Sequence, residues 1–139
     1  MSYNRDWDAF NRDVIVEFRA NAGQVAGRKY PLILLTTTGA KSGLPRTTPL
    51  NYSIDGDRII VIASKAAAPT HPDWYHNLLA HPEVSVEVGT EQFSAIASVP
   101  SEPERTKLYE KMESISSGFT EYKHKTSRII PVITLSRKS

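Results

Sequence analysis

Apolar residues near the N-terminus recur at helical spacing. Between residues 4 and about 22, intervals of three and four separate Trp7, Phe10, Val14 and Phe18. This spacing places the four side chains on one stripe of a helix. Gly23 and Gly27 follow, and we expect them to end the helix.

The next apolar runs have the length of strands. PLILLTTT (31–38) is a short run rich in strand formers, and residues 46–54 form a second extended run. Asp55-Gly56 then precedes RIIVIAS (58–64), which is a good hairpin signal. Because nearly all residues of the 58–64 run are apolar, we expect a strand in the centre of its sheet.

A short aromatic helix is predicted after the AAAP loop. Thr70 is placed to cap it, Pro72 falls in its first turn, and Pro82 ends it after Trp74 and Leu78. VSVEV (84–88) and QFSAIASV (92–99) then alternate in polarity around Gly89-Thr90. This pattern predicts a second hairpin.

The C-terminal part contains one more helix and one more strand. Ser101 and Glu104 match a capping box for a helix whose apolar positions are Leu108, Met112 and Ile115. IIPVITL (129–135) indicates a last strand, and its Pro131 favours either a strand start or a sheet edge.

The predicted order is α, β, β, β, α, β, β, α, β in one domain, residues 1–139. Tight turns between consecutive strands favour antiparallel pairing. We therefore predict a mainly β, α+β fold: a small, partly closed antiparallel barrel with helices packed outside it.

Composition excludes several classes of function. Forty per cent apolar residues suffice for one buried core, and a net charge of +2 provides neither a basic nucleic-acid arm nor an acidic disordered tail. The pI of 8.9 favours an anionic partner. The chain lacks cysteine and any apolar run long enough to span a bilayer, so we expect a soluble, cytoplasmic protein.

TTTGAKSGLPRTTPL (36–50) resembles a phosphate-binding loop at first sight. A Walker motif needs glycine where Ala40 and Leu35 stand, and this loop leads into a strand instead of a helix. No GxGxxG supports a dinucleotide fold, and no GxSxG supports a serine hydrolase.

Three histidines lie close together in sequence: His71, His76 and His81. On a helix, residues five apart differ by about 140° in direction, so the three do not share a face. We therefore expect capping or surface histidines and no metal site.

The remaining candidate is a group of cations. Lys41 and Arg46 flank one strand-connecting loop, and Lys65 follows the 58–64 strand. We expect strand pairing to bring these ends together, where arginine and lysine would suit phosphate or carboxylate. The alternative is a solvated hairpin tip with ordinary surface charges.

Two longer segments carry a family resemblance. LLTTTGAKSGLPRTTPL (34–50) and VIASKAAAPTHPDWYHNLLAHPEVSVEVG (61–89) resemble the deazaflavin-dependent nitroreductase family, small split β-barrel proteins that use 8-hydroxy-5-deazaflavin coenzyme F(420). A weaker likeness covers the N-terminal helix, FTEYKHKTSRIIPV (119–132) and the chain end. The resemblance implies a split antiparallel barrel with flanking helices.

The resemblance also implies a set of coenzyme contacts. The phosphate would be bound by Lys41, Ser42, Gly43 and Arg46. The deazaflavin and its side chain would be lined by Thr48, Pro49, Ala63, Ser64 and Lys65, with Trp74 and Asn77 covering the ring system. The coenzyme carries a phosphodiester and a glutamate tail, which agrees with the cationic loop.

The implied reaction is hydride transfer to a small electrophile: a quinone, an enone or a nitro compound. Ser64 and Tyr122 match positions that face the substrate, and Phe119 would form an apolar wall. Ser116 and Phe119 replace tyrosines of the nitroimidazole-activating member, which argues against bulky nitro prodrugs. Ala66-Ala67 stand where family members often carry two glycines.

Other interpretations stay open at this point. The chain could carry the deazaflavin without turnover, or be a split-barrel protein that binds FMN or haem; nucleic-acid binding ranks last. The N-terminal stripe could cover the pocket, pack on the barrel or rest on a membrane as a peripheral contact. Both a monomer and a homodimer agree with the resemblance.

Overall fold

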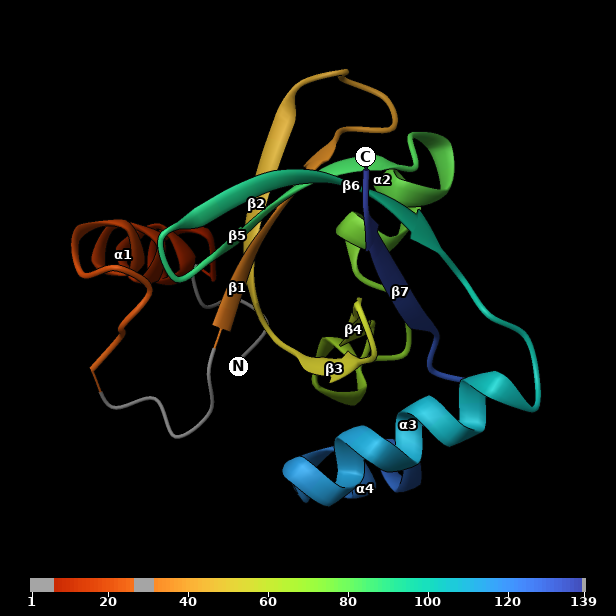
Figure 1. The fold of residues 1–139 in the computed structure, drawn as a ribbon. Helices are drawn as coiled ribbons and strands as arrows, with labels where there is room; N and C mark the ends of the chain where they lie inside the picture. Colours follow the sequence, from red (N-terminus) through yellow and green to blue (C-terminus); the bar gives the residue numbers. More distant parts are fainter. Residues whose placement is uncertain (1–6, 27–31, 139) are drawn as a thin grey trace.

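The computed structural model describes residues 7–26 and 32–138. Its helices are α1 (Trp7–Ala20), α2 (Asp73–Ala80), α3 (Glu104–Ile115) and α4 (Gly118–Lys125), and a short 3-10 helix, η2 (Lys65–Ala67), precedes α2. Its strands are β1 (Leu32–Thr38), β2 (Pro45–Asn51), β3 (Ser53–Asp55), β4 (Arg58–Ile62), β5 (Glu83–Val88), β6 (Glu91–Ser98) and β7 (Val132–Arg137) (Figure 1).

The seven strands of the described residues form one antiparallel sheet in the order β2-β1-β5-β6-β7-β4-β3. The sheet curves so that β2 approaches β4, and helices flank it (Figure 1). This arrangement confirms the predicted split antiparallel barrel with flanking helices. β4 pairs with both β3 and β7, as predicted for an apolar strand inside a sheet.

Both predicted hairpins are confirmed. Asp55 pairs with Arg58, so Gly56 and Asp57 form the tip of the first one, and Gly56 has a positive φ of 63°. Val88 pairs with Glu91 around Gly89-Thr90 in the second.

One strand prediction is confirmed and one needs correction. β7 begins directly after Pro131, which is the strand-start alternative, and it lies between β6 and β4. Pro131 precedes the ladder, so its missing N–H costs no strand pairing, while its carbonyl accepts from the Ala63 N–H at 3.0 Å. The extended run of residues 46–54 is interrupted at Tyr52, and its two pieces lie at opposite edges of the sheet.

Burial on both faces explains the continuous apolar runs of β1 and β4. Leu32 and Leu34 pack against α1 on the outer face, whereas Ile33 and Leu35 join the main core on the concave face. β4 follows the same alternation between the main core and the α3–α4 side: Ile59 and Val61, then Ile60 and Ile62. Each such burial contributes about 1.5–3 kcal/mol.

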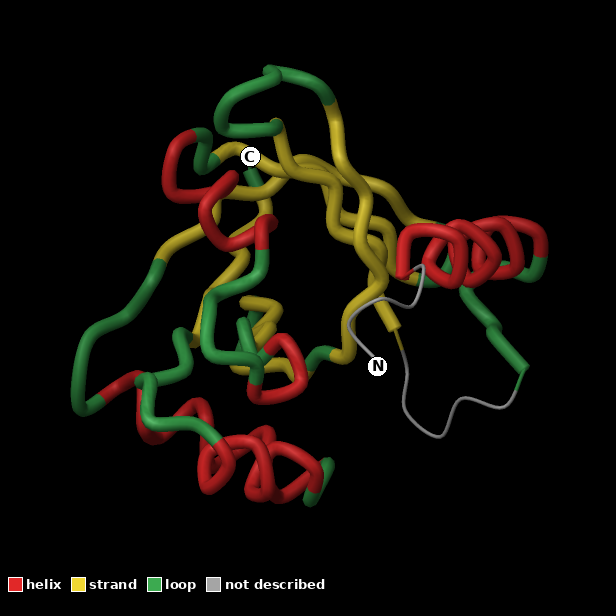
Figure 2. Tube along the Cα trace, turned by 180° about the vertical axis from the view of Figure 1, so that it is seen from behind, coloured by secondary structure: helices red, strands yellow, loops and turns green. Residues whose placement is uncertain are grey.

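The predicted N-terminal stripe packs on the barrel through its C-terminal half. Val14 and Phe18 are buried against β1, and Figure 2 shows α1 lying outside the sheet. Phe10 is 45% exposed. The side chain of Trp7 and all of Gly27 lie outside the described residues.

The C-terminal helical region holds two helices where one was predicted. The chain leaves α3 after Ile115, and α4 begins at Gly118. Glu113 accepts hydrogen bonds from Thr120 at 2.6 Å and Lys123 at 3.1 Å, which join α4 to α3. Phe119 then completes an apolar cluster with β4 and β7.

Both predicted helix caps are wrong. The N-cap positions of α2 and α3 are Pro72 and Pro103, without side-chain capping bonds. The Thr70 hydroxyl instead accepts from Lys65 Nζ at 3.1 Å. The Glu102 carboxylate serves α3, because it accepts from the Thr106 N–H at 3.1 Å.

Two glycine substitutions test how closely α1 approaches the β5–β6 turn. A Cβ on Gly23 (φ +89°) would lie 2.8 Å from the Gly89 Cα, whereas a Cβ on Gly56 (φ +63°) would meet nothing within 4 Å. We expect Gly23→Ala to lower the free energy of unfolding by about 2–4 kcal/mol and Gly56→Ala by about 1 kcal/mol. Urea unfolding measures both, and equal losses would contradict the close contact.

Candidate functional site

The turn between β1 and β2 is held by its own backbone. The Gly39 N–H donates to the Leu44 carbonyl at 2.8 Å, and the Gly43 N–H donates to the Gly39 carbonyl at 2.9 Å. The Ser42 hydroxyl accepts from the Leu44 N–H at 3.1 Å, and Gly43 has a positive φ of 71°. The segment is therefore a defined turn that leads from one strand into the next. This agrees with the sequence argument against a P-loop, which would lead into a helix.

Asn77 of α2 ties this turn to the core. Its side-chain oxygen accepts from the Ala40 N–H at 3.0 Å, and its amide nitrogen donates to the Thr37 hydroxyl at 3.2 Å. Asn77 is 8% exposed and Thr37 is 1% exposed, so water competes little for these bonds. The family resemblance implied that Asn77 covers the ring system of the coenzyme. In the structure, both ends of its side-chain amide form hydrogen bonds with the protein.

Lys41 is exposed within the turn, and Arg46 is exposed at the second position of β2. Within residues 7–26 and 32–138, neither forms an ion pair, and the Lys41 and Ser42 N–H groups have no acceptor. Two cations and two backbone donors are thus available to an anion.

The register of β2 decides which predicted residues share a face. Arg46 pairs with Thr37 and Thr48 with Leu35, so both point to the concave face, where Ala63 and Trp74 belong to the main core. Pro49 pairs with Leu34 on the outer face. The structure therefore does not bring the Thr48 and Pro49 side chains to one surface.

Lys65 lies away from the other two cations. β4 pairs with β3 and β7, not with β1 or β2, so strand pairing does not join these ends as expected. In Figures 1 and 2 the β1–β2 turn is at the top, whereas η2 lies below, beside α4. The predicted contacts therefore form two groups, one around the turn and one around residues 63–65.

Arg128 holds the second group in place, although no sequence pattern predicted this role. Its guanidinium donates to the carbonyls of Ala68 at 2.8 Å, Ala63 at 3.1 Å and Ser64, and it contacts His71 Nδ1 at 2.9 Å. In the sequence, Arg128 was marked only by its place in TSRIIPV, within the weaker part of the family resemblance.

The same loop carries two non-glycine residues with positive φ, Lys65 at 48° and Ala67 at 63°. A left-handed conformation costs an alanine about 1–2 kcal/mol, which glycine avoids. The resemblance implies glycines at Ala66 and Ala67, and Ala67 is a position where this loop has φ above zero. The hydrogen bonds from Arg128 offset this cost.

The predicted substrate residues lie beside this loop, on α4. Phe119 is 6% exposed, and its ring meets Tyr122 edge-on at 5.5 Å. The Tyr109 hydroxyl donates to the Phe119 carbonyl at 2.6 Å, and burial raises the pKa of Tyr109 to about 12. Phe119 is therefore a core residue that positions the half-buried Tyr122.

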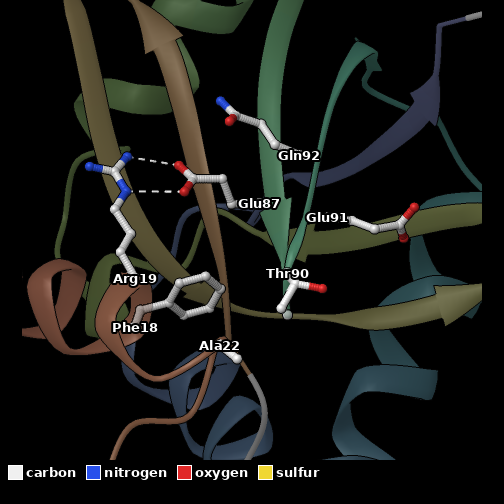
Figure 3. A pocket seen from close by; sticks show the side chains of 8 residues that line it. Phe18, Arg19, Ala22, Glu87, Thr90, Glu91 and Gln92 are labelled. Atoms are coloured by element: carbon white, nitrogen blue, oxygen red, sulfur yellow. Dashed lines mark hydrogen bonds and ion pairs between the residues drawn. The ribbon is translucent and has the colours of Figure 1, made fainter.

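A surface pocket lies elsewhere, between the end of α1 and the β5–β6 hairpin (Figure 3). Arg19 crosses it to the Glu87 carboxylate, with bonds of 3.0 and 2.7 Å that raise the pKa of Arg19. None of the predicted site residues lines this pocket. Its ion pair fixes α1 on β5.

The sequence model of the F420H(2)-dependent quinone reductase family matches residues 10–137. The chain belongs to this family. It is 40% identical over 127 residues to the F420H(2)-dependent quinone reductase Rv1261c of Mycobacterium tuberculosis, covering 87% of this chain and 85% of that one.

Solved structures agree with this family. One described as the F420-H2 dependent reductase FDR-A is 35% identical, with a TM-score of 0.71, over 81% of this chain and 100% of that one. Another, described as a domain-swapped dimer, is 33% identical, with a TM-score of 0.73, over 94% and 98%.

Membership of the quinone reductase family confirms the resemblance found in the sequence. The chain is an oxidoreductase, its cofactor is coenzyme F(420), and quinone reduction is its function. A carrier without turnover, or an FMN or haem protein, is not favoured. No helix in the described part is long and apolar enough to cross a membrane.

Replacing Asn77 tests its hold on the turn. Asn77→Ala leaves the Ala40 N–H and the Thr37 hydroxyl without their partner, so we expect unfolding to become easier by about 1–3 kcal/mol. Leu79→Ala, on the exposed side of the same helix, is the control and should change stability by less than about 0.5 kcal/mol. Equal urea midpoints for the two variants would contradict the anchor.

Proposed function

We propose that the β1–β2 turn binds the phosphate of coenzyme F(420) through Lys41, Ser42, Gly43 and Arg46. The observation that carries this is the pair of exposed cations without acidic partners among the described residues, on a turn anchored by Asn77. Lysine supplies a point charge, arginine a planar fork, and Gly43 lets the backbone approach closely.

The ring system would lie along the concave face, from Thr48 toward Ala63, Ser64 and Lys65. Arg46 and Thr48 point to that face in register, and Ala63 and Trp74 belong to its core. The separation of the two residue groups suits a coenzyme whose phosphate and rings are far apart. Pro49 and Asn77 would act through the backbone and the turn rather than through ring contact.

When bound, the reduced deazaflavin supplies the hydride. The protein excludes water, orients the quinone, and offers the Ser64 and Tyr122 hydroxyls to the oxygen on which negative charge develops. Phe119 keeps Tyr122 in place through its edge-on contact. Quinones are the first class of acceptor; enones and small nitro compounds are further candidates of the same electron-poor chemistry.

The assembly and the membrane contact can be measured directly. A relative described as a domain-swapped dimer favours testing a homodimer against a monomer by light scattering. Phe10 and Val16 of α1 are 45% and 66% exposed, so sedimentation with liposomes tests a peripheral membrane contact.

Titration with the coenzyme, with FMN as a competitor, tests the proposal. We expect binding in about the micromolar range, near −8 kcal/mol, and no displacement by FMN. Oxidation of the reduced coenzyme by menadione, compared with cyclohexenone, then ranks the acceptors. A protein that binds the coenzyme but oxidises it with neither acceptor would contradict the catalytic part.

Lys41→Ala and Arg46→Ala test the phosphate contacts. Each removes a charge-assisted bond, so we expect coenzyme affinity to fall by about 1–3 kcal/mol. Lys107→Ala removes an equal charge on α3 and serves as the control. If all three variants bind equally well, the turn does not hold the phosphate.

Tyr122→Phe tests the proposed hydroxyl. The ring and its contact with Phe119 stay, so coenzyme affinity should not change, while kcat for menadione should fall at least about tenfold. Steady-state kinetics beside a binding titration separates the two effects. An unchanged kcat would remove Tyr122 from the reaction.

A further inference from the structure

Arg128 concentrates four hydrogen bonds on one short loop. Its Nε donates to Ala68, one terminal nitrogen donates to Ala63 and contacts His71, and the other donates to Ser64. Three of these partners are backbone carbonyls on either side of η2. A guanidinium offers five N–H donors in a rigid plane, so one side chain fixes the path of the whole loop.

The fourth bond sets a condition on His71. A guanidinium has no acceptor, so His71 Nδ1 must accept the hydrogen bond across the 2.9 Å contact. The ring is then neutral and carries its proton on Nε2. A protonated imidazole would instead present an N–H and a positive charge to the cation of Arg128.

The contacts of His71 with the described residues disfavour its protonated form. Its ring lies 4.9 Å from Tyr75 and 6.0 Å from His76, and no carboxylate in the described residues forms an ion pair with it. Burial, the charge of Arg128 and that of His76 lower the pKa of His71 below 6.5. His71 therefore accepts from Arg128 at neutral pH.

We propose that Arg128 is a positioning residue, which holds residues 63–68 in place for the coenzyme only while His71 is neutral. The relation to the coenzyme rests on the proposed function, because Ala63, Ser64 and Lys65 lie on this loop. The hydrogen bonding of residues 63–68 and His71 by Arg128, called the clamp below, is a property of the free protein. The clamp and its effect on coenzyme binding are measured separately.

The direction of the pH response follows from the lowered pKa. The contribution of the neutral imidazole is fully present above pH 6.5, the ordinary value, and is lost as the pH falls through the folded pKa of His71. Acidification should therefore release the loop before the barrel unfolds.

Hydrogen exchange of the coenzyme-free protein tests the clamp alone. Peptides covering residues 63–71 are compared from about pH 7.5 to about pH 5, after correction for intrinsic exchange rates. We expect the wild type to lose protection as the pH falls. His71→Asn keeps an acceptor near the Nδ1 position without titrating, and should keep its protection; the same loss in both proteins would overturn the pH condition.

Coenzyme titration over the same pH range tests the link to the site. We expect wild-type affinity to fall about tenfold on acidification and His71→Asn to keep it. His76→Asn removes the neighbouring imidazole, which does not bond to Arg128, and should keep the loss of affinity, with a midpoint at higher pH because a charge that lowers the pKa of His71 is gone. A pH response that follows His76 would overturn the assignment to His71.

Arg128→Lys tests positioning at neutral pH. One ammonium cannot reach all three carbonyls in the same plane, so loop protection should fall and coenzyme affinity should drop about tenfold, while peptides of β5 and β6 keep their protection. Wild-type protection in Arg128→Lys would overturn the proposal. If the wild type binds no coenzyme at any pH, the proposed function fails, and the exchange data still decide the clamp.

Discussion

The fold depends on two strands that are buried on both faces. β1 and β4 send alternate side chains into the concave core and into an outer cluster, so each strand is enclosed between two apolar layers. α2 fills the concave side through Trp74 and Leu78. With β1 and β4 enclosed in this way, the connecting segments and the partly exposed edge strand β2 are left accessible to ligands.

Two polar side chains fix those connecting segments through hydrogen bonds. Asn77 joins a buried hydroxyl to the backbone of the β1–β2 turn, and Arg128 joins the last loop before β7 to the backbone around η2. Asn77 bonds to one main-chain N–H and one hydroxyl, and Arg128 bonds to three main-chain carbonyls. The turn and the loop therefore keep a fixed shape although both carry exposed lysines.

Most of the fold could be predicted because its signal lies in side-chain periodicity. The apolar runs, the alternating strands and the glycine turns gave the strands and both hairpins. GFTEYKHK was missed as a helix because it buries only Phe119 and has a weak apolar pattern. The prediction that Lys65 lies beside Lys41 and Arg46 was wrong because local sequence does not determine the order of strands within the sheet.

The candidate site was predictable in part for a related reason. The family likeness supplied the residues around Lys41 and Ser64, and the comparisons confirmed the family and its coenzyme. The roles of Arg128 and Asn77 were not predicted because their partners are distant in sequence and include backbone groups, which any residue type carries.

The pairing of β2 with β1 has a consequence for how the family can vary. β2 is an edge strand, and among the described strands it pairs with β1 alone, with the Thr36 and Thr47 hydroxyls 2.8 Å apart across the pair. A slip by one residue would exchange the two sides of the strand and move the Arg46 guanidinium away from the concave face. Length changes in the 39–44 turn should therefore be tolerated only in steps that preserve this parity.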